Sequence, residues 1–135
     1  MDDEEALTRV LTDYYSAFGT LDVRAILAYY HEPCLLVGPQ GVAALPNHAA
    51  LAAAFAPVME GLRARGYGRS ELSMPHVKRL SATAALASGV AVRYKADGQE
   101  LERVGISYVL HKADDDRWTI AVTVVHDTEK VVRPE

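Results

Sequence analysis

Two tyrosines and one histidine are the side chains of this sequence whose positions best suit proton transfer on a small substrate: Tyr14, Tyr108 and His126. A tyrosine hydroxyl can donate a hydrogen bond to an oxygen that gains negative charge, and an imidazole exchanges protons near neutral pH. Tyr14 belongs to an apolar helical stripe, whereas Tyr108 and His126 follow the period-two pattern of strands. The three are therefore the candidate catalytic residues of an acid/base site, and a structural place in the core is the alternative for each.

The dipeptide at 97–98, Asp-Gly between two apolar runs, predicts a β-hairpin with a two-residue turn. Such a turn places Arg93 opposite Glu102. It also places Lys95 opposite Glu100, so two pairs of opposite charge support the same register.

The last strand is predicted from the alternation that follows the acidic turn at 113–117. The residues on one of its faces are Trp118, Ile120, Val122, Val124 and His126. If the turn leaves three residues unpaired, His126 lies opposite Val104 and on the same face as Tyr108. Glu102 would then be close enough to fix the tautomer of the imidazole, which makes this end of the sheet the predicted site of acid/base chemistry.

The strand before the hairpin carries little side-chain volume on one face. The residues of that face are Ala85, Ala87, Gly89 and Ala91. A face of this kind leaves space for a ligand, or it allows the close approach of a helix or of a second subunit. The abundance of alanine in the chain is the alternative explanation.

Two helices are predicted at the N-terminal end. Apolar residues at helical spacing define the first one, and they are Leu7, Val10, Leu11, Tyr14 and Phe18. Acidic residues at 2–5 favour its start, and Gly19 stops it. Asp22 is the predicted N-cap of the second helix, which must end before Pro33.

A short strand and a third helix complete the predicted elements. Residues 34–38, Cys-Leu-Leu-Val-Gly, are expected to form a buried strand that a turn at 38–41 closes. Asn47 caps the third helix, Pro57 is expected to kink it, and it ends at Gly66. The predicted fold class is α+β, with three N-terminal helices that cover one curved antiparallel sheet.

Composition limits the classes of function. With 135 residues, half of them hydrophobic, the chain fits a single domain over residues 1–135. The formal charge of -4 and the scattered basic residues argue against nucleic acid as a partner, and no apolar run is long enough to span a membrane. The start has no signal-peptide core and Cys34 is the single cysteine, so a cytoplasmic protein is expected. The five histidines show no ligand spacing, so neither a metal nor a cofactor is expected.

The order of these elements, with Ile-Leu-Ala-Tyr-Tyr-His-Glu-Pro at 26–33 and Asp-Asp-Asp-Arg-Trp-Thr-Ile at 114–120, resembles the nuclear transport factor 2-like superfamily. That group includes SnoaL-like polyketide cyclases, ketosteroid isomerases and scytalone dehydratase. The resemblance covers essentially the whole chain as one SnoaL-like domain. It implies that the sheet and the helices form a cone around a pocket for a small apolar molecule.

The same resemblance bears on the candidate catalytic residues. It places Tyr14 where the isomerases keep the tyrosine that hydrogen-bonds a developing oxyanion. Those enzymes carry a general-base aspartate in an Asp-Pro pair after the first strand, and this chain has Gly38-Pro39 there. The steroid-type base is therefore absent.

Two functions remain open. The first is a cofactor-independent isomerase, dehydratase or cyclase that acts on a carbonyl-bearing substrate, and the second is a non-catalytic ligand-binding or accessory protein of the same fold. The residues expected to contact the ligand are Tyr30, Phe55, Met59, Glu102 and Trp118. A homodimer is expected through the other face of the sheet, which carries Leu86, Val90, Val92, Leu101 and Val109.

Overall fold

The computed structural model describes residues 3–131 and, within that range, every side chain except that of Met74. Its α-helices are α1 (Asp3–Phe18), α2 (Val23–Ile26) and α3 (His48–Ala64), and its 3-10 turns are η1 (Leu27–Tyr29) and η2 (Thr128–Lys130). The strands are β1 (Tyr30–Gly38), β2 (Gly41–Leu45), β3 (Tyr67–Arg79), β4 (Ala84–Lys95), β5 (Glu100–Lys112) and β6 (Trp118–His126). In the described range, no helix combines the length and the apolar composition that crossing a membrane requires.

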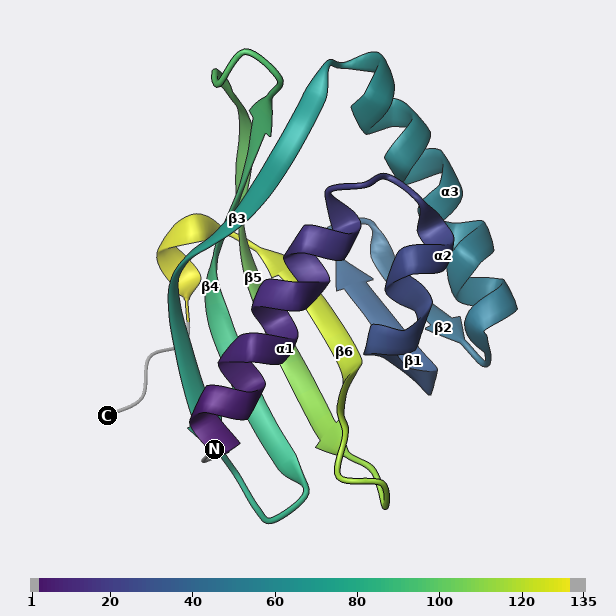
Figure 1. The fold of residues 1–135 in the computed structure, drawn as a ribbon, viewed down its shortest axis with the longest axis vertical. Coiled ribbons are helices and arrows are strands. Elements are labelled where there is room, and N and C mark those ends of the chain that lie inside the picture. Colours follow the sequence, from purple (N-terminus) through teal and green to yellow (C-terminus); the bar gives the residue numbers. More distant parts are fainter. Residues whose placement is uncertain (1–2, 132–135) are drawn as a thin grey trace.

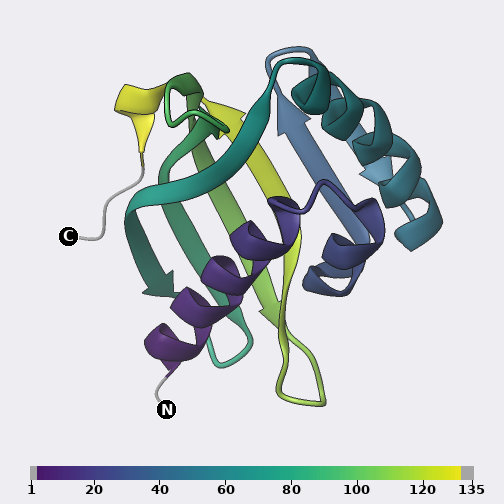
Figure 2. The ribbon, with the colours of Figure 1, turned by 45° about the horizontal axis from the view of Figure 1, so that its top comes forward.

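The strands form one curved sheet of six strands in the order β2-β1-β6-β5-β4-β3. The predicted α+β class is confirmed, with all three helices on one face of the sheet (Figures 1 and 2). The sheet is not purely antiparallel as predicted, because β1 pairs with β6 in parallel. These two strands are the first and the last in the chain, and their long connection allows the parallel arrangement that a hairpin forbids.

The second helix is shorter than predicted. Asp22 does cap it, accepting a hydrogen bond from the Arg24 amide at 3.1 Å, but the α-helix ends at Ile26 and the strand begins at Tyr30. Tyr30 is 2% exposed and pairs with Ile120, so burial in the sheet outweighs its place in a helical pattern. Pro33 lies inside β1, where the β1–β6 pairing is interrupted and no amide is needed.

The third helix begins and ends near the predicted residues. The Asn47 side chain accepts a hydrogen bond from the Ala50 amide at 2.9 Å, and the helix passes through Pro57 to Ala64. The turn predicted at 38–41 joins β1 to β2, with Gly38 paired to Gly41. Gly41 has a φ of 138°, which explains why a glycine closes this turn.

The β4–β5 hairpin confirms half of its predicted register. Arg93 pairs with Glu102 as predicted, but Lys95 does not face Glu100, because the Lys95 amide donates to Gln99 across a three-residue turn. Gly98 occupies the left-handed region of that turn, with a φ of 93°. A one-residue irregularity between Arg93 and Tyr94 then restores the predicted register. Two shifts of one residue therefore cancel along the body of the hairpin.

The β5–β6 pairing contains a bulge that was not predicted from the sequence. Lys112 pairs with Trp118 and Leu110 with Ile120, whereas Val109 pairs with Val122, so Ala121 is the extra residue. Because side chains alternate along a strand, one extra residue exchanges the two faces of β6 beyond it.

Candidate functional site

A cavity of about 270 Å³ lies between α1, α3 and the helix-covered face of the sheet. Its polar lining consists of Tyr14, Tyr15, Tyr30, Tyr108, Thr123, Arg93 and Ser70. Its apolar lining includes Phe18, Leu36, Phe55, Ala91, Ile106 and Val125. We call this space the inner cavity. It has the composition typical of a small-molecule site, which is apolar with a few polar groups.

Four tyrosine hydroxyls of the inner cavity are joined in two pairs. The hydroxyls of Tyr14 and Tyr30 are 2.7 Å apart, and Tyr30 also reaches the Thr123 hydroxyl at 3.4 Å. The hydroxyls of Tyr15 and Tyr108 are 2.7 Å apart. Each pair joins a residue of α1 to a residue of the sheet, so the hydroxyls both line the cavity and hold the helix on the sheet.

Burial keeps these tyrosines protonated. It raises the pKa of Tyr14 and Tyr108 well above the usual value, and neighbouring tyrosines raise both further. Burial likewise raises the pKa of Tyr15, and it raises that of Tyr30 to about 12 even though the hydrogen bonds from Thr123 and Tyr14 oppose the shift. All four phenols are therefore neutral hydrogen-bonding groups at physiological pH.

Arg93 brings the inner cavity a positive charge. Its guanidinium donates to Oε2 of Glu102 at 2.7 Å, and Arg65 donates to Oε1 of the same carboxylate at 2.6 Å. Burial acts to raise the pKa of Glu102, but the hydrogen bond from Arg65 and the charge of Arg93 outweigh it, so the pKa lies below the usual value. Glu102 is therefore ionised and shared between two arginines.

Four of the predicted site residues line the inner cavity, and they are Tyr14, Tyr30, Phe55 and Tyr108. Three others lie elsewhere. Met59 is 2% exposed and belongs to the core, and Trp118 lies near the turn that leads into β6, in contact with Lys112. Glu102 contacts Arg93 without lining the cavity. Trp118 pairs with Lys112 before the bulge, so it stays on the inner face as predicted, but it lies at the opposite end of β6 from the cavity residues Thr123 and Val125.

The predicted position of His126 is wrong. It pairs with Gly105 instead of Val104, so it lies on the face of the sheet opposite to Tyr108. There its Nδ1 donates to the Asp127 carbonyl at 2.8 Å, which leaves Nε2 to accept from the Ser107 hydroxyl at 2.8 Å. A Cβ on Gly105 would come within 2.4 Å of this imidazole, so the glycine makes room for it. The imidazole therefore has no access to the inner cavity.

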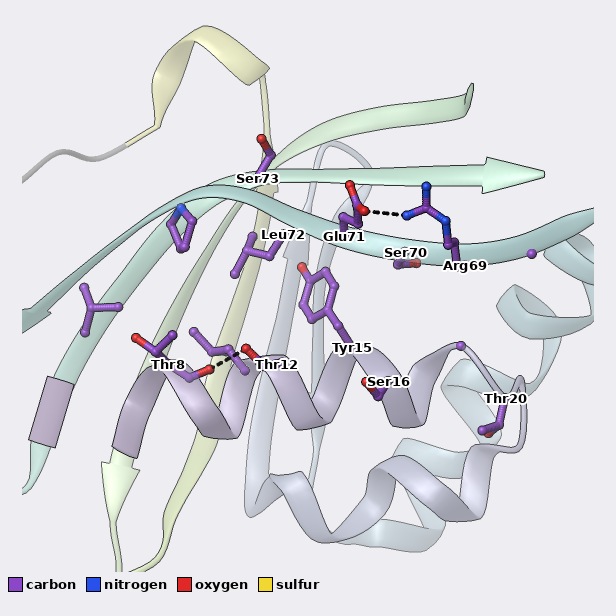
Figure 3. A pocket seen from close by; sticks show the side chains of 15 residues that line it. Thr8, Thr12, Tyr15, Ser16, Thr20, Arg69, Ser70, Glu71, Leu72 and Ser73 are labelled. Atoms are coloured by element: carbon purple, nitrogen blue, oxygen red, sulfur yellow. Dashed lines mark hydrogen bonds and ion pairs between the residues drawn. The ribbon is translucent and has the colours of Figure 1, made fainter. Parts of the chain in front are cut away.

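A second and larger hollow, of about 710 Å³, lies between α1 and the edge strand β3 (Figure 3). We call it the outer groove. Thr8, Thr12, Ser16 and Thr20 face it from α1 and its C-terminal end. Arg69 and Glu71 of β3 form an ion pair with each other beside it. Tyr15 and Ser70 line both hollows and separate one from the other.

Arg93 and Thr123 line the cavity without having been predicted to do so from the sequence. The alternation that places Ala91 on the inner face also places Arg93 there, so this signal was present in the sequence. Thr123 could not be found in this way, because only the bulge at Ala121 turns it towards Tyr30.

The family model described as NTF2-like protein (DUF6841) matches residues 3–128 of the chain. A search among curated proteins finds no match.

Solved structures are similar over nearly the whole chain. A protein of unknown function with a cystatin-like fold from Nostoc punctiforme has 15% identity and a TM-score of 0.78, with 96% of this chain and 91% of that chain covered. A ketosteroid isomerase-like protein from Erwinia carotovora atroseptica has 20% identity and a TM-score of 0.67, with 99% and 100% covered. Aln2 from a Streptomyces species has 16% identity and a TM-score of 0.75, with 96% and 94% covered. At these identities the similarity establishes the fold.

Proposed function

This chain belongs to the NTF2-like proteins described as DUF6841, and from that premise and the contents of its inner cavity we propose that it is a non-catalytic small-molecule-binding protein. The ligand would have a largely apolar body that lies against Phe18, Phe55 and Ile106. Its oxygen atoms would exchange hydrogen bonds with the tyrosine hydroxyls.

One observation carries this proposal: the described lining of the inner cavity offers phenols, hydroxyls and one guanidinium, and none of these accepts a proton at neutral pH. A general base needs a pKa near the working pH and must lie within hydrogen-bond reach of its proton. His126 lies on the opposite face of the sheet, and Glu102 is neutralised by two arginines. Binding without turnover is what these groups support.

Isomerisation is the competing function, and one of the similar structures is titled ketosteroid isomerase-like. In this chain β1 ends at Gly38, which has no side chain to act as the base, and, apart from its chain neighbours, no described atom lies within 4 Å of the position that a Cβ would take there. Tyr14 can accept a hydrogen bond from Tyr30 and still donate to an oxyanion, so the group that isomerisation lacks here is the base. We therefore expect no isomerisation of a β,γ-unsaturated ketone by the purified protein, as followed by ultraviolet absorbance.

Binding can be tested with a neutral aromatic probe, 2-naphthol, by isothermal titration calorimetry. Ala91 is 4% exposed and lines the inner cavity, so Ala91→Leu should fill the cavity and remove binding. Thr12→Leu adds an apolar side chain in the outer groove and should leave binding unchanged. Equal binding by both variants, or rapid conversion of the ketone, would refute the proposed function.

We also propose that the protein is a homodimer through the face of the sheet that the helices leave uncovered. One row of directly paired residues crosses five strands there, namely Ala44, Leu35, Val122, Val109 and Leu86. Leu35 is 38% exposed, which favours a partner over solvent. Two residues predicted for this interface are not free to contact a partner subunit. Val92 is 3% exposed, and Leu101 packs against the core.

Sedimentation velocity at micromolar concentration tests the dimer. Val122→Lys places a charge at the centre of the row and should give a monomer. Leu80→Lys changes a side chain that is 56% exposed and lies outside the row, so this variant should remain a dimer. A wild-type monomer at these concentrations would overturn the proposal.

A further inference from the structure

We propose that the ligand of the inner cavity carries a carboxylate that binds the guanidinium of Arg93. This inference rests on the proposed function and adds the chemical class of the ligand, a small aromatic monocarboxylate. Among the described residues that line the cavity, Arg93 alone carries a formal charge. An apolar space with a single cation in its wall selects an anion over a neutral molecule of the same shape.

The charges around Arg93 do not cancel. Arg65 and Arg93 share the one carboxylate of Glu102, which leaves this cluster with an excess of one positive charge. The side chains of Arg93 and Glu102 are 22% and 27% exposed, whereas that of Arg65 is 51% exposed, so the charge of Arg93 is the less screened of the two positive charges. A ligand carboxylate would bring the cluster to neutrality.

The guanidinium of Arg93 also has donors left for a ligand. Only Nη1 makes a hydrogen bond within the part of the chain that the structure describes, and its partner is Glu102. A guanidinium has five N–H donors in a planar fork that matches a carboxylate. Because Arg65 holds Oε1 of Glu102, that carboxylate stays paired if Arg93 turns partly towards a ligand.

The rest of the cavity fixes the body of the ligand. The guanidinium of Arg93 lies 5.5 Å from the ring of Phe18, and Phe18 packs edge to face against Phe55 with ring centroids 6.2 Å apart. An aromatic ring packs favourably against such neighbours, because edge-to-face contacts are favourable. A volume of about 270 Å³ is below the range of drug-sized sites, so the ligand is small.

The test compares phenylacetate with phenylacetamide, which have the same shape and differ in charge, by isothermal titration calorimetry at pH 7. We expect wild-type protein to bind the carboxylate about tenfold or more tightly than the amide. Arg93→Gln should bind both compounds equally. Arg93→Lys keeps the charge and should retain part of the preference for phenylacetate. This variant tests the same contact if Arg93→Gln fails to fold.

Arg69→Gln is the matched control, because Arg69 also pairs with a glutamate but lines the outer groove. It should keep the full preference for phenylacetate. Equal binding of the two compounds by wild-type protein, or a preference that survives in Arg93→Gln, overturns this inference and leaves the proposed function intact. Failure of both compounds and of 2-naphthol to bind overturns the proposed function itself.

Discussion

The inner cavity and the outer groove both carry a set of hydroxyl groups, and the two sets are arranged differently. In the cavity, Tyr14 is hydrogen-bonded to Tyr30 and Tyr15 to Tyr108, across the boundary between helix and sheet. In the groove, the Thr12 hydroxyl returns to the Thr8 carbonyl of its own helix at 2.9 Å. Thr12 and its neighbours on that stripe face solvent, whereas Tyr14, Tyr30 and Tyr108 are buried and Tyr15 is half-buried.

The arrangement of the polar groups distinguishes the two hollows as ligand sites better than their volumes do. The groove, at about 710 Å³, is the larger hollow, but Arg69 and Glu71 form an ion pair with each other, and together they leave no net charge among the described residues that line it. The cavity holds about 270 Å³, and its polar groups converge from α1, β1, β4, β5 and β6 on one buried space. A ligand site needs convergent groups from which water is excluded, so the smaller hollow is the better candidate.

The largest predicted difference between the cavity tyrosines and the groove hydroxyls is their effect on the free energy of unfolding at alkaline pH. Tyr14, Tyr15, Tyr30 and Tyr108 have pKa values above the unfolded value of 10.0, that of Tyr30 being about 12. Between pH 10.0 and a pH of about 12, the folded state binds more protons than the unfolded state, so the free energy of unfolding falls as the pH rises through this range. Each group contributes at most about 1.4 kcal/mol per pH unit, and the four together at most about 5 kcal/mol per pH unit.

Urea unfolding at pH 8, 10 and 11, followed by the fluorescence of Trp118, measures this loss. Tyr30→Phe removes one of the four groups and should reduce the slope against pH by about a quarter. Removal of the groove hydroxyl in Thr12→Ala should leave the slope unchanged. An alkaline slope that Tyr30→Phe does not alter would show that Tyr30 is not held neutral by burial.

A single hydroxyl of the cavity should also stabilise the fold more than one of the groove. Tyr108→Phe leaves the Tyr15 hydroxyl without its partner at 2.7 Å, and we expect a loss of about 1 to 3 kcal/mol in the free energy of unfolding at pH 7. Thr12→Ala removes a hydroxyl that bonds its own helix and introduces a better helix former. We expect a change within about 0.5 kcal/mol for it, from urea unfolding of both variants. Equal losses would remove the distinction between the two hollows.

Much of the fold followed from the sequence because local signals and burial agree there. The caps at Asp22 and Asn47 and the pair Arg93–Glu102 are where the sequence predicts them. The site depended on non-local geometry. A single extra residue at Ala121 exchanged the faces of β6, so His126 left the predicted site and Thr123 entered it.

No pattern marks that bulge, because Trp118 to His126 alternates without interruption in the sequence. Its position is set by pairing with two strands at once, β5 on one side and β1 on the other. In contrast, Tyr14 and Tyr108 were found because helical and strand periodicity each place them on a buried face. Periodicity therefore predicts a site residue only as far as the strand stays regular.

The smallest predicted effect concerns the empty space itself. Ala91→Leu adds three carbon atoms to a side chain that is 4% exposed and borders the inner cavity. Burial of these carbons stabilises the fold by up to about 2 kcal/mol, and packing strain offsets about 1 to 3 kcal/mol. We therefore expect a net change in the free energy of unfolding within about 1 kcal/mol, from urea unfolding at pH 7. Thr12→Leu, in the groove, should change it by no more than about 0.5 kcal/mol. A loss of more than about 3 kcal/mol in Ala91→Leu would mean that side chains already fill the space beside Ala91, and a ligand would have no room there.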